Sequence, residues 1–315
     1  MTIDQQTAAL LDLINQHVAS PGEEVTIANA RAGANALFSG FAGEIEQNCL
    51  IKDRLIKGQD HDVPVRIYHP GGGTTSSSLP VILFFHGGGW SLGDVDSYDS
   101  LVRSLCVSSG AIYISVDYRL GPEHKYPAAL NDCLTVTEWL LAHGGDIGGD
   151  ISRIAVMGDS AGGNLATITA HKINSRSNKA IKAQFLLYPV IDISRPHDHY
   201  PSRITKGNGE YLLSRDGIDV AVDWYLTKGD DRADPTISPI RQDDLSPLPP
   251  TVILVGGLDP LLDEARAYHD KLTACGVAST LECYDTTIHA FLSFGTMDIA
   301  HKGRKYIANK VRELL

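Results

Sequence analysis

Short apolar runs alternate with amphipathic stretches along most of the chain. The apolar runs lie at 81–85, 111–116, 153–157, 183–187, 251–255 and 279–284. Such runs are typical of strands that are buried on both faces of a parallel sheet. Between them, apolar residues recur at helical spacing at 96–108, 126–143, 161–174, 261–274 and 297–314. Regular alternation of this kind predicts an α/β fold, a three-layer sandwich with helices on both faces of the sheet.

The N-terminal part of the chain follows another pattern. Apolar residues at helical spacing from about 5 to 41, interrupted at Pro21-Gly22, predict two helices. Residues 49–56 and 63–69 alternate as paired strands do, and the Gly- and Ser-rich segment 71–78 predicts a surface connection.

The segment 191–244 does not fit the alternation, because it is rich in Asp, Arg, Pro and Gly and predicts only a helix near 212–226. An insertion between two core strands is a natural lid over a site. We therefore expect a helical cap built from 1–45 and 191–244, and a core built from 46–190 and 245–315.

Composition narrows the choice of partners and location. A formal net charge of -11 argues against a nucleic-acid partner, which would need a basic face. The N-terminus lacks a secretory signal, and no apolar run is long enough to cross a membrane. The five cysteines form no C-x-x-C pair, so neither a zinc site nor a disulfide framework is indicated. We expect a cytoplasmic protein with no metal and no membrane partner.

The strongest motif is Gly158-Asp159-Ser160-Ala161-Gly162, which follows an apolar strand and opens a helix. This is the context of a nucleophile elbow, in which a tight turn lifts a serine hydroxyl to a helix N-terminus. Ser160 is therefore the predicted nucleophile.

A glycine-rich loop, His86-Gly87-Gly88-Gly89-Trp90, follows the strand at 81–85. Its backbone N–H groups, with that of Ala161, predict an oxyanion hole. No Gly-Lys-Ser/Thr follows, which argues against a phosphate loop. His86 is expected to anchor this loop.

A serine nucleophile needs a base and an orienting acid, which follow it in this order: Ser, acid, His. Of the later histidines, His289 is the one that follows the last predicted strand on a loop. Asp259 lies on the loop just past the strand at 251–255, where it can face the site, so it is the predicted acid. It also precedes Pro260, which opens a helix, and a role as helix N-cap is compatible with this. Asp263, one helical turn further on, is the alternative.

Together these motifs resemble the hormone-sensitive-lipase-like esterases, bacterial family IV, in the branch with Asp inside the elbow. A further matching segment runs from Asp117 to His124 and continues as Tyr126-Pro127-Ala128-Ala129. We interpret Arg119 and Glu123 within it as charges that support the loops.

The resemblance implies an α/β-hydrolase fold with a mostly parallel, eight-stranded sheet and a helical cap. It also implies hydrolysis of short-chain carboxylic esters without a cofactor, with Gly88 and Gly89 as oxyanion donors beside Ala161. Family members often form dimers through the edge strand and last helix, here about 279–284 and 297–314. Trp90 and Tyr188 are candidates for walls of the substrate pocket, although both could equally be core residues.

Two other functions remain open on this scaffold. An amide-cleaving hydrolase of the arylformamidase kind would use the same triad on a harder leaving group. A non-catalytic receptor for small molecules is the other alternative, against which the presence of His289 argues. A lipase is disfavoured because the insertion is polar, which favours water-soluble substrates.

Overall fold

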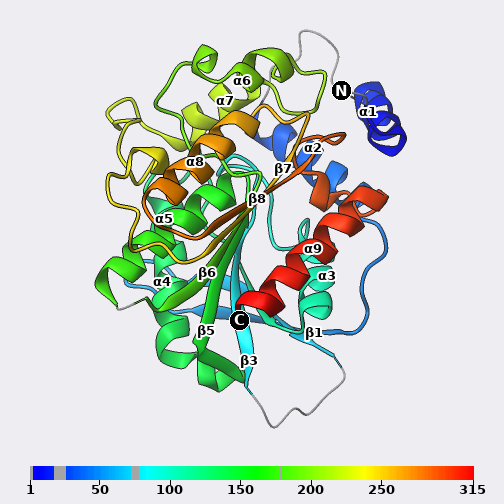
Figure 1. Cartoon of the computed structure of the whole chain (residues 1–315). Coiled ribbons are helices and arrows are strands. Elements are labelled where there is room, and N and C mark those ends of the chain that lie inside the picture. Colours follow the sequence, from blue (N-terminus) through cyan, green and yellow to red (C-terminus); the bar gives the residue numbers. More distant parts are fainter. Residues whose placement is uncertain (1–2, 18–25, 72–77, 178) are drawn as a thin grey trace.

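The structure is a computed structural model that describes residues 3–17, 26–71, 78–177 and 179–315. The predicted break at Pro21-Gly22 and most of the predicted connection at 71–78 lie outside these residues. An eight-stranded sheet with the order β1-β2-β4-β3-β5-β6-β7-β8 forms the centre of the molecule (Figure 1). The strands are β1 (Cys49–Ile56), β2 (Val63–Pro70), β3 (Leu79–Phe85), β4 (Ile112–Val116), β5 (Gly149–Asp159), β6 (Ile181–Leu187), β7 (Thr251–Gly256) and β8 (Ser279–Tyr284).

Strand β2 runs antiparallel to both of its neighbours, and all the other strand pairs are parallel. Every residue of β4 and of β7 is buried, as expected for parallel strands that are covered on both faces. Helices pack on the two faces: α3 and α9 on one, and α4, α5 and α8 on the other (Figure 1). These helices are α3 (Asp99–Ser109), α4 (Ala128–His143), α5 (Ala161–Arg176), α8 (Leu262–Ala274) and α9 (Asp298–Leu314). The predicted three-layer α/β-hydrolase sandwich is confirmed.

The register of the central strands brings two loops together. Phe85, the last residue of β3, pairs with Val116 of β4 on one side and with Gly158 of β5 on the other. The chain therefore reverses its direction across the sheet after β4, and the loops that follow β3 and β5 leave the sheet side by side. Such a switch point at the carboxyl ends of parallel strands is where open α/β sheets bind ligands.

Three helices from distant parts of the sequence lie beyond this end of the sheet: α2 (Ile27–Gly40), α6 (Pro201–Lys206) and α7 (Arg215–Tyr225) (Figure 1). Helix α7 begins three residues later than the predicted helix at 212–226, because Ser214 caps it. The Ser214 hydroxyl accepts a hydrogen bond from the Gly217 N–H at 3.0 Å. Helix α6 was not predicted, since six residues with Pro201 at their start are too few to show a helical period.

Helix α1 (Gln5–His17) packs near the loop that follows β8. The Thr7 and Thr287 hydroxyls are 3.2 Å apart, and the Gln6 side-chain carbonyl accepts the Asp298 N–H at 2.8 Å. Leu10 and Leu11 are buried. The first described helix thus braces the segment that carries His289.

Candidate active site

Ser160 lies on the sharp turn between β5 and α5. Its backbone has φ 52° and ψ -118°, a conformation that is strained for a residue with a side chain. The turn is held by the Ser160 N–H, which donates to the Leu187 carbonyl at 2.8 Å, and by the Ser160 carbonyl, which accepts the Val190 N–H at 3.1 Å. A side chain at Gly162 would collide with the backbone of Phe85, so this position of the motif requires glycine. The sequence therefore places the serine hydroxyl at the N-terminus of α5.

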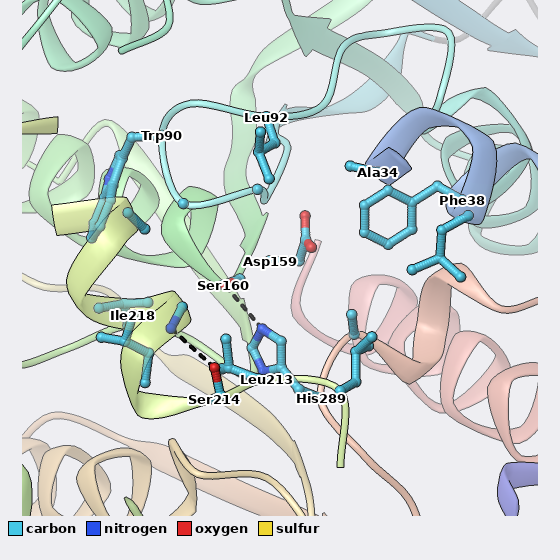
Figure 2. Close-up of a pocket in the computed structure, with 18 of the residues that line it drawn as sticks. Ala34, Phe38, Trp90, Leu92, Asp159, Ser160, Leu213, Ser214, Ile218 and His289 are labelled. Atoms are coloured by element: carbon cyan, nitrogen blue, oxygen red, sulfur yellow. Dashed lines mark hydrogen bonds between the residues drawn. The ribbon is translucent and has the colours of Figure 1, made fainter. Parts of the chain in front are cut away.

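Three of the predicted residues form a hydrogen-bonded series. His289 Nε2 lies 2.9 Å from Ser160 Oγ (Figure 2). On the other side of the ring, His289 Nδ1 lies 2.7 Å from Asp259 Oδ2. Asp259 is fully buried, His289 is nearly so, and Ser160 is 9% exposed. With Nδ1 protonated toward the carboxylate, Nε2 is free to accept the serine proton. This arrangement can perform nucleophilic catalysis with general-base assistance.

The loop after β7 fixes the carboxylate of Asp259. Its Oδ1 accepts the Leu261 N–H at 2.8 Å, so that the N-cap-like contact and the contact with His289 use different oxygens. The Leu258 N–H donates to the Thr287 carbonyl at 2.9 Å, which ties the acid loop to the histidine loop. Asp263, the alternative acid, instead accepts the Ser202 N–H of α6 at 2.7 Å.

The glycine-rich loop after β3 borders the same site. His86 stacks on Tyr118 with ring centroids 4.3 Å apart, and its Nδ1 lies 2.8 Å from the Gly87 carbonyl oxygen. Burial lowers the pKa of His86 to about 4, so this imidazole is neutral and serves the loop as an anchor. Gly88 and Gly89 line the cavity beside Ser160. Ala161 begins α5 directly after the serine.

Asp159 holds two loops of the site together, a role that was not predicted from the sequence. There the residue served only to assign the chain to the family branch with Asp inside the elbow. Its carboxylate accepts the Gly87 N–H at 2.7 Å and the Tyr98 hydroxyl at 3.0 Å, and so joins the elbow to the glycine-rich loop. Burial raises the pKa of Asp159 to about 7, although both hydrogen bonds favour the carboxylate. The sequence did contain a signal for this role, because Asp159 is an acidic residue at the end of an otherwise apolar strand and directly precedes the nucleophile.

Ser160 and His289 open into a cavity of about 280 Å³ (Figure 2). Residues of α2, the glycine-rich loop and α7 line it with mostly apolar side chains, among them Phe38, Leu92, Ile218 and Trp224. Trp90 is one of the lining residues. For Tyr188 the structure favours the core alternative: its side chain is fully buried, it is not among the described residues that line this cavity, and its ring packs edge-on against His289 with the ring centroids 5.0 Å apart.

Arg119 and Glu123 of the 117–124 segment bind other parts of the fold. Arg119 pairs with Asp132 of α4 at 2.7 Å. Glu123 pairs with Arg31 of α2 at 2.6 Å, and the Arg31 Nε–H donates to the Ser91 carbonyl at 2.9 Å. Both charges therefore support loops around the site. Arg31, the partner of Glu123, was not predicted from the sequence because it belongs to no motif.

Neither a metal cluster nor a membrane span occurs in the part of the chain that the structure describes. Among residues 3–17, 26–71, 78–177 and 179–315, no group of three or more His, Cys, Asp or Glu side chains could hold a metal ion. In the same ranges no helix is both long and apolar enough to cross a bilayer.

Comparison with known proteins identifies the family. Residues 82–293 match the family described as alpha/beta hydrolase fold. Carboxylesterase NlhH of Mycobacterium tuberculosis is 39% identical over 239 residues, which cover 74% of this chain and 72% of the relative. Ethyl acetate hydrolase of Pseudomonas putida is 35% identical over 265 residues, covering 84% of this chain and 81% of the relative. The solved structure of the hyperthermophilic esterase from the archaeon Pyrobaculum calidifontis superposes with a TM-score of 0.90 at 32% identity over 99% of each chain.

The chain belongs to this α/β-hydrolase-fold family. Within it, the resemblance to the hormone-sensitive-lipase-like esterases of family IV is confirmed by relatives that are themselves named esterases.

Proposed function

We propose that this chain is a serine carboxylesterase that cleaves small, neutral carboxylic esters through an acyl-enzyme on Ser160. That the reaction is ester hydrolysis follows from the family and from the carboxylesterases and esterases within it. The observation that supports the choice of residues is the hydrogen-bonded series from Asp259 through His289 to Ser160. It lies at the edge of an apolar cavity that a substrate can enter.

The first half of the reaction forms the acyl-enzyme. Ser160 Oγ attacks the ester carbonyl while His289 Nε2 takes its proton, and Asp259 stabilises the imidazolium that results. The carbonyl oxygen becomes negative in the tetrahedral intermediate, and the N–H groups of Gly88, Gly89 and Ala161 donate to it. His289 then gives its proton to the departing alkoxide, which leaves as the alcohol.

The second half uses the same groups in reverse. His289 takes a proton from water, the resulting hydroxide attacks the acyl carbonyl, and the oxyanion again forms beside the glycine-rich loop. Collapse of this intermediate breaks the bond to Ser160 Oγ, which recovers its proton from His289. The carboxylic acid is released, and no cofactor enters either half.

The lining of the cavity supports uncharged substrates. Among the described residues that line it there is no lysine or arginine, and its acidic member, Asp159, is already bonded to Gly87 and Tyr98. A carboxylate on the substrate would therefore find no cationic partner and would lose its hydration. The mostly apolar lining also suits an uncharged acyl chain.

The test compares wild type with Ser160→Ala and with Ser175→Ala, a control on the same helix whose hydroxyl is exposed and bonds only to the His171 carbonyl among the contacts described. We expect a fluorophosphonate probe to label wild type and Ser175→Ala but not Ser160→Ala. Turnover of p-nitrophenyl esters from acetyl to decanoyl should follow the labelling and peak at short chains. Undiminished turnover by Ser160→Ala would refute the residue assignment. A higher kcat/KM on matched anilides would favour the amide-cleaving alternative, and neither labelling nor turnover in wild type would favour a receptor.

Three further expectations belong to this proposal. Residues 1–45 and 191–244 form a substrate-selecting cap on a core of 46–190 and 245–315. The edge strand β8 and helix α9 form a homodimer contact, which a monomeric mass in multi-angle light scattering would contradict. The protein resides in the cytoplasm, in keeping with five free cysteines, and cell fractionation tests this location.

A further inference from the structure

The C-terminal end of α7 is held by a lysine from the core. Lys125 Nζ donates to the carbonyl oxygens of Asp223 at 2.6 Å, Trp224 at 3.1 Å and Leu226 at 2.8 Å. The last carbonyls of a helix have no partner within it, and the negative end of the helix dipole attracts a cation. One ammonium group therefore satisfies this end of α7.

Two neighbouring contacts fix the same end. The Tyr126 N–H donates to the Tyr225 carbonyl at 2.8 Å. The rings of Trp90 and Tyr225 stack with centroids 4.4 Å apart and an interplanar angle of 6°. Helix α7 is thus attached both to the 125–126 segment and to Trp90, the last residue of the glycine-rich loop.

One turn earlier on the same face, α7 also reaches Gly89 of the glycine-rich loop. Gly89 has a φ of +58°, and a Cβ at this position would lie 2.7 Å from Cβ of Ala221. That distance is too short for two carbon atoms, so only a glycine lets the helix come this close to the loop. Ala221 therefore limits how far the backbone of Gly89 can move toward α7.

We propose that Lys125 is a positioning residue that keeps α7, and with it Ala221, against Gly89. This inference rests on the proposed function, in which the Gly89 N–H receives the oxyanion. An oxyanion donor acts only when it points at the place where charge develops, and a displacement of about 1 Å can cost a hundredfold in rate. Because that interaction is stronger in the transition state than in the ground state, its loss lowers kcat more than it raises KM.

The experiment compares Lys125→Met with Lys271→Met on p-nitrophenyl butyrate. Lys271 is a matched control, since its ammonium donates to the carbonyls of Ile240 and Gln242, both at 2.7 Å, in the same 191–244 segment but away from α7. We expect Lys125→Met to lose about tenfold in kcat, a fraction of the loss from removing a donor outright. Lys271→Met should keep the kcat of wild type, and Lys125→Arg, which retains charge and donors, should recover most of it. Equal kcat values for the two Met variants would overturn the proposal, as would a rise in KM alone.

A second variant keeps the test valid if Lys125→Met folds poorly. Ala221→Gly removes the methyl group that touches the loop, and we expect it to lower kcat in the same way. The double variant should lose less than the product of the two single losses, because both act on one contact. Independent, multiplicative losses would contradict the proposed route from Lys125 to Gly89.

Fluorophosphonate labelling of wild type distinguishes a failure of the proposed function from a failure of the role proposed for Lys125. If Ser160 is not labelled, the proposed function is wrong. If Ser160 is labelled but Lys125→Met has the kcat of wild type, only the role of Lys125 is rejected.

Discussion

Asp159→Asn should change the way in which stability depends on pH. Burial raises the pKa of Asp159 from an ordinary value of 3.8 to about 7, so the native state binds this proton more tightly than the unfolded chain does. The stability that this proton contributes is fully present below pH 3.8 and is lost as the pH rises through about 7. The difference in pKa corresponds to about 4 kcal/mol in the free energy of unfolding, of which about 3 kcal/mol is lost between pH 5 and pH 8.

Asparagine keeps the shape of the side chain and an oxygen for the Gly87 N–H, but it does not titrate. We therefore expect the difference in unfolding free energy, variant minus wild type, to rise by about 3 kcal/mol from pH 5 to pH 8. Urea unfolding followed by far-UV circular dichroism at several pH values measures this difference. Ser160→Ala is the control at the adjacent residue and should give a difference that does not depend on pH. A difference for Asp159→Asn that varies by less than about 1 kcal/mol over this range would refute the reasoning, because one pKa unit is worth about that much.

Three further outcomes follow from the described contacts. Asp259→Asn should lower kcat by about four orders of magnitude, whereas Asp263→Asn should change kcat little, as steady-state kinetics on one ester will show. Arg203→Met leaves its buried partner Glu264 without a counterion, and urea unfolding should reveal a loss of about 3–5 kcal/mol. Ile218→Ala enlarges the cavity and should raise relative kcat/KM for longer acyl chains by about fourfold per additional buried methylene, measured across p-nitrophenyl esters. An unchanged chain-length profile would show that Ile218 does not limit the substrate.

Much of the fold could be predicted because its elements have strong local patterns. Strands β1 and β8 have the predicted bounds, and the core helices differ from the predicted ranges by no more than about three residues. The closeness of His289 and Asp259 could be predicted from the sequence, since loops at the carboxyl ends of parallel strands meet at one edge of the sheet. Their hydrogen bonds join residues that lie far apart in the sequence but at equivalent strand ends.

The remaining features depend on contacts that have no local pattern. Lys125 binds carbonyls about a hundred residues later in the chain, and backbone carbonyls carry no sequence signal at all. The position of Tyr188 against His289 follows from a backbone φ of 38° that the sequence does not indicate. Periodicity and motifs therefore predict which residues the fold brings together at the site, whereas the packing of α2 and α7 around them depends on tertiary contacts.

The pairing of β3 with β5 joins two sets of residues of the proposed site. Ser160, Asp259 and His289, which would move the proton, come after β5 begins, whereas Gly88 and Gly89, two of the three proposed oxyanion donors, follow β3. The two halves meet where Phe85 pairs with Gly158. A shift of β3 against β5 would therefore move the proposed oxyanion donors relative to the proposed nucleophile. This strand pair is thus the place where the two parts of the proposed site are held in register.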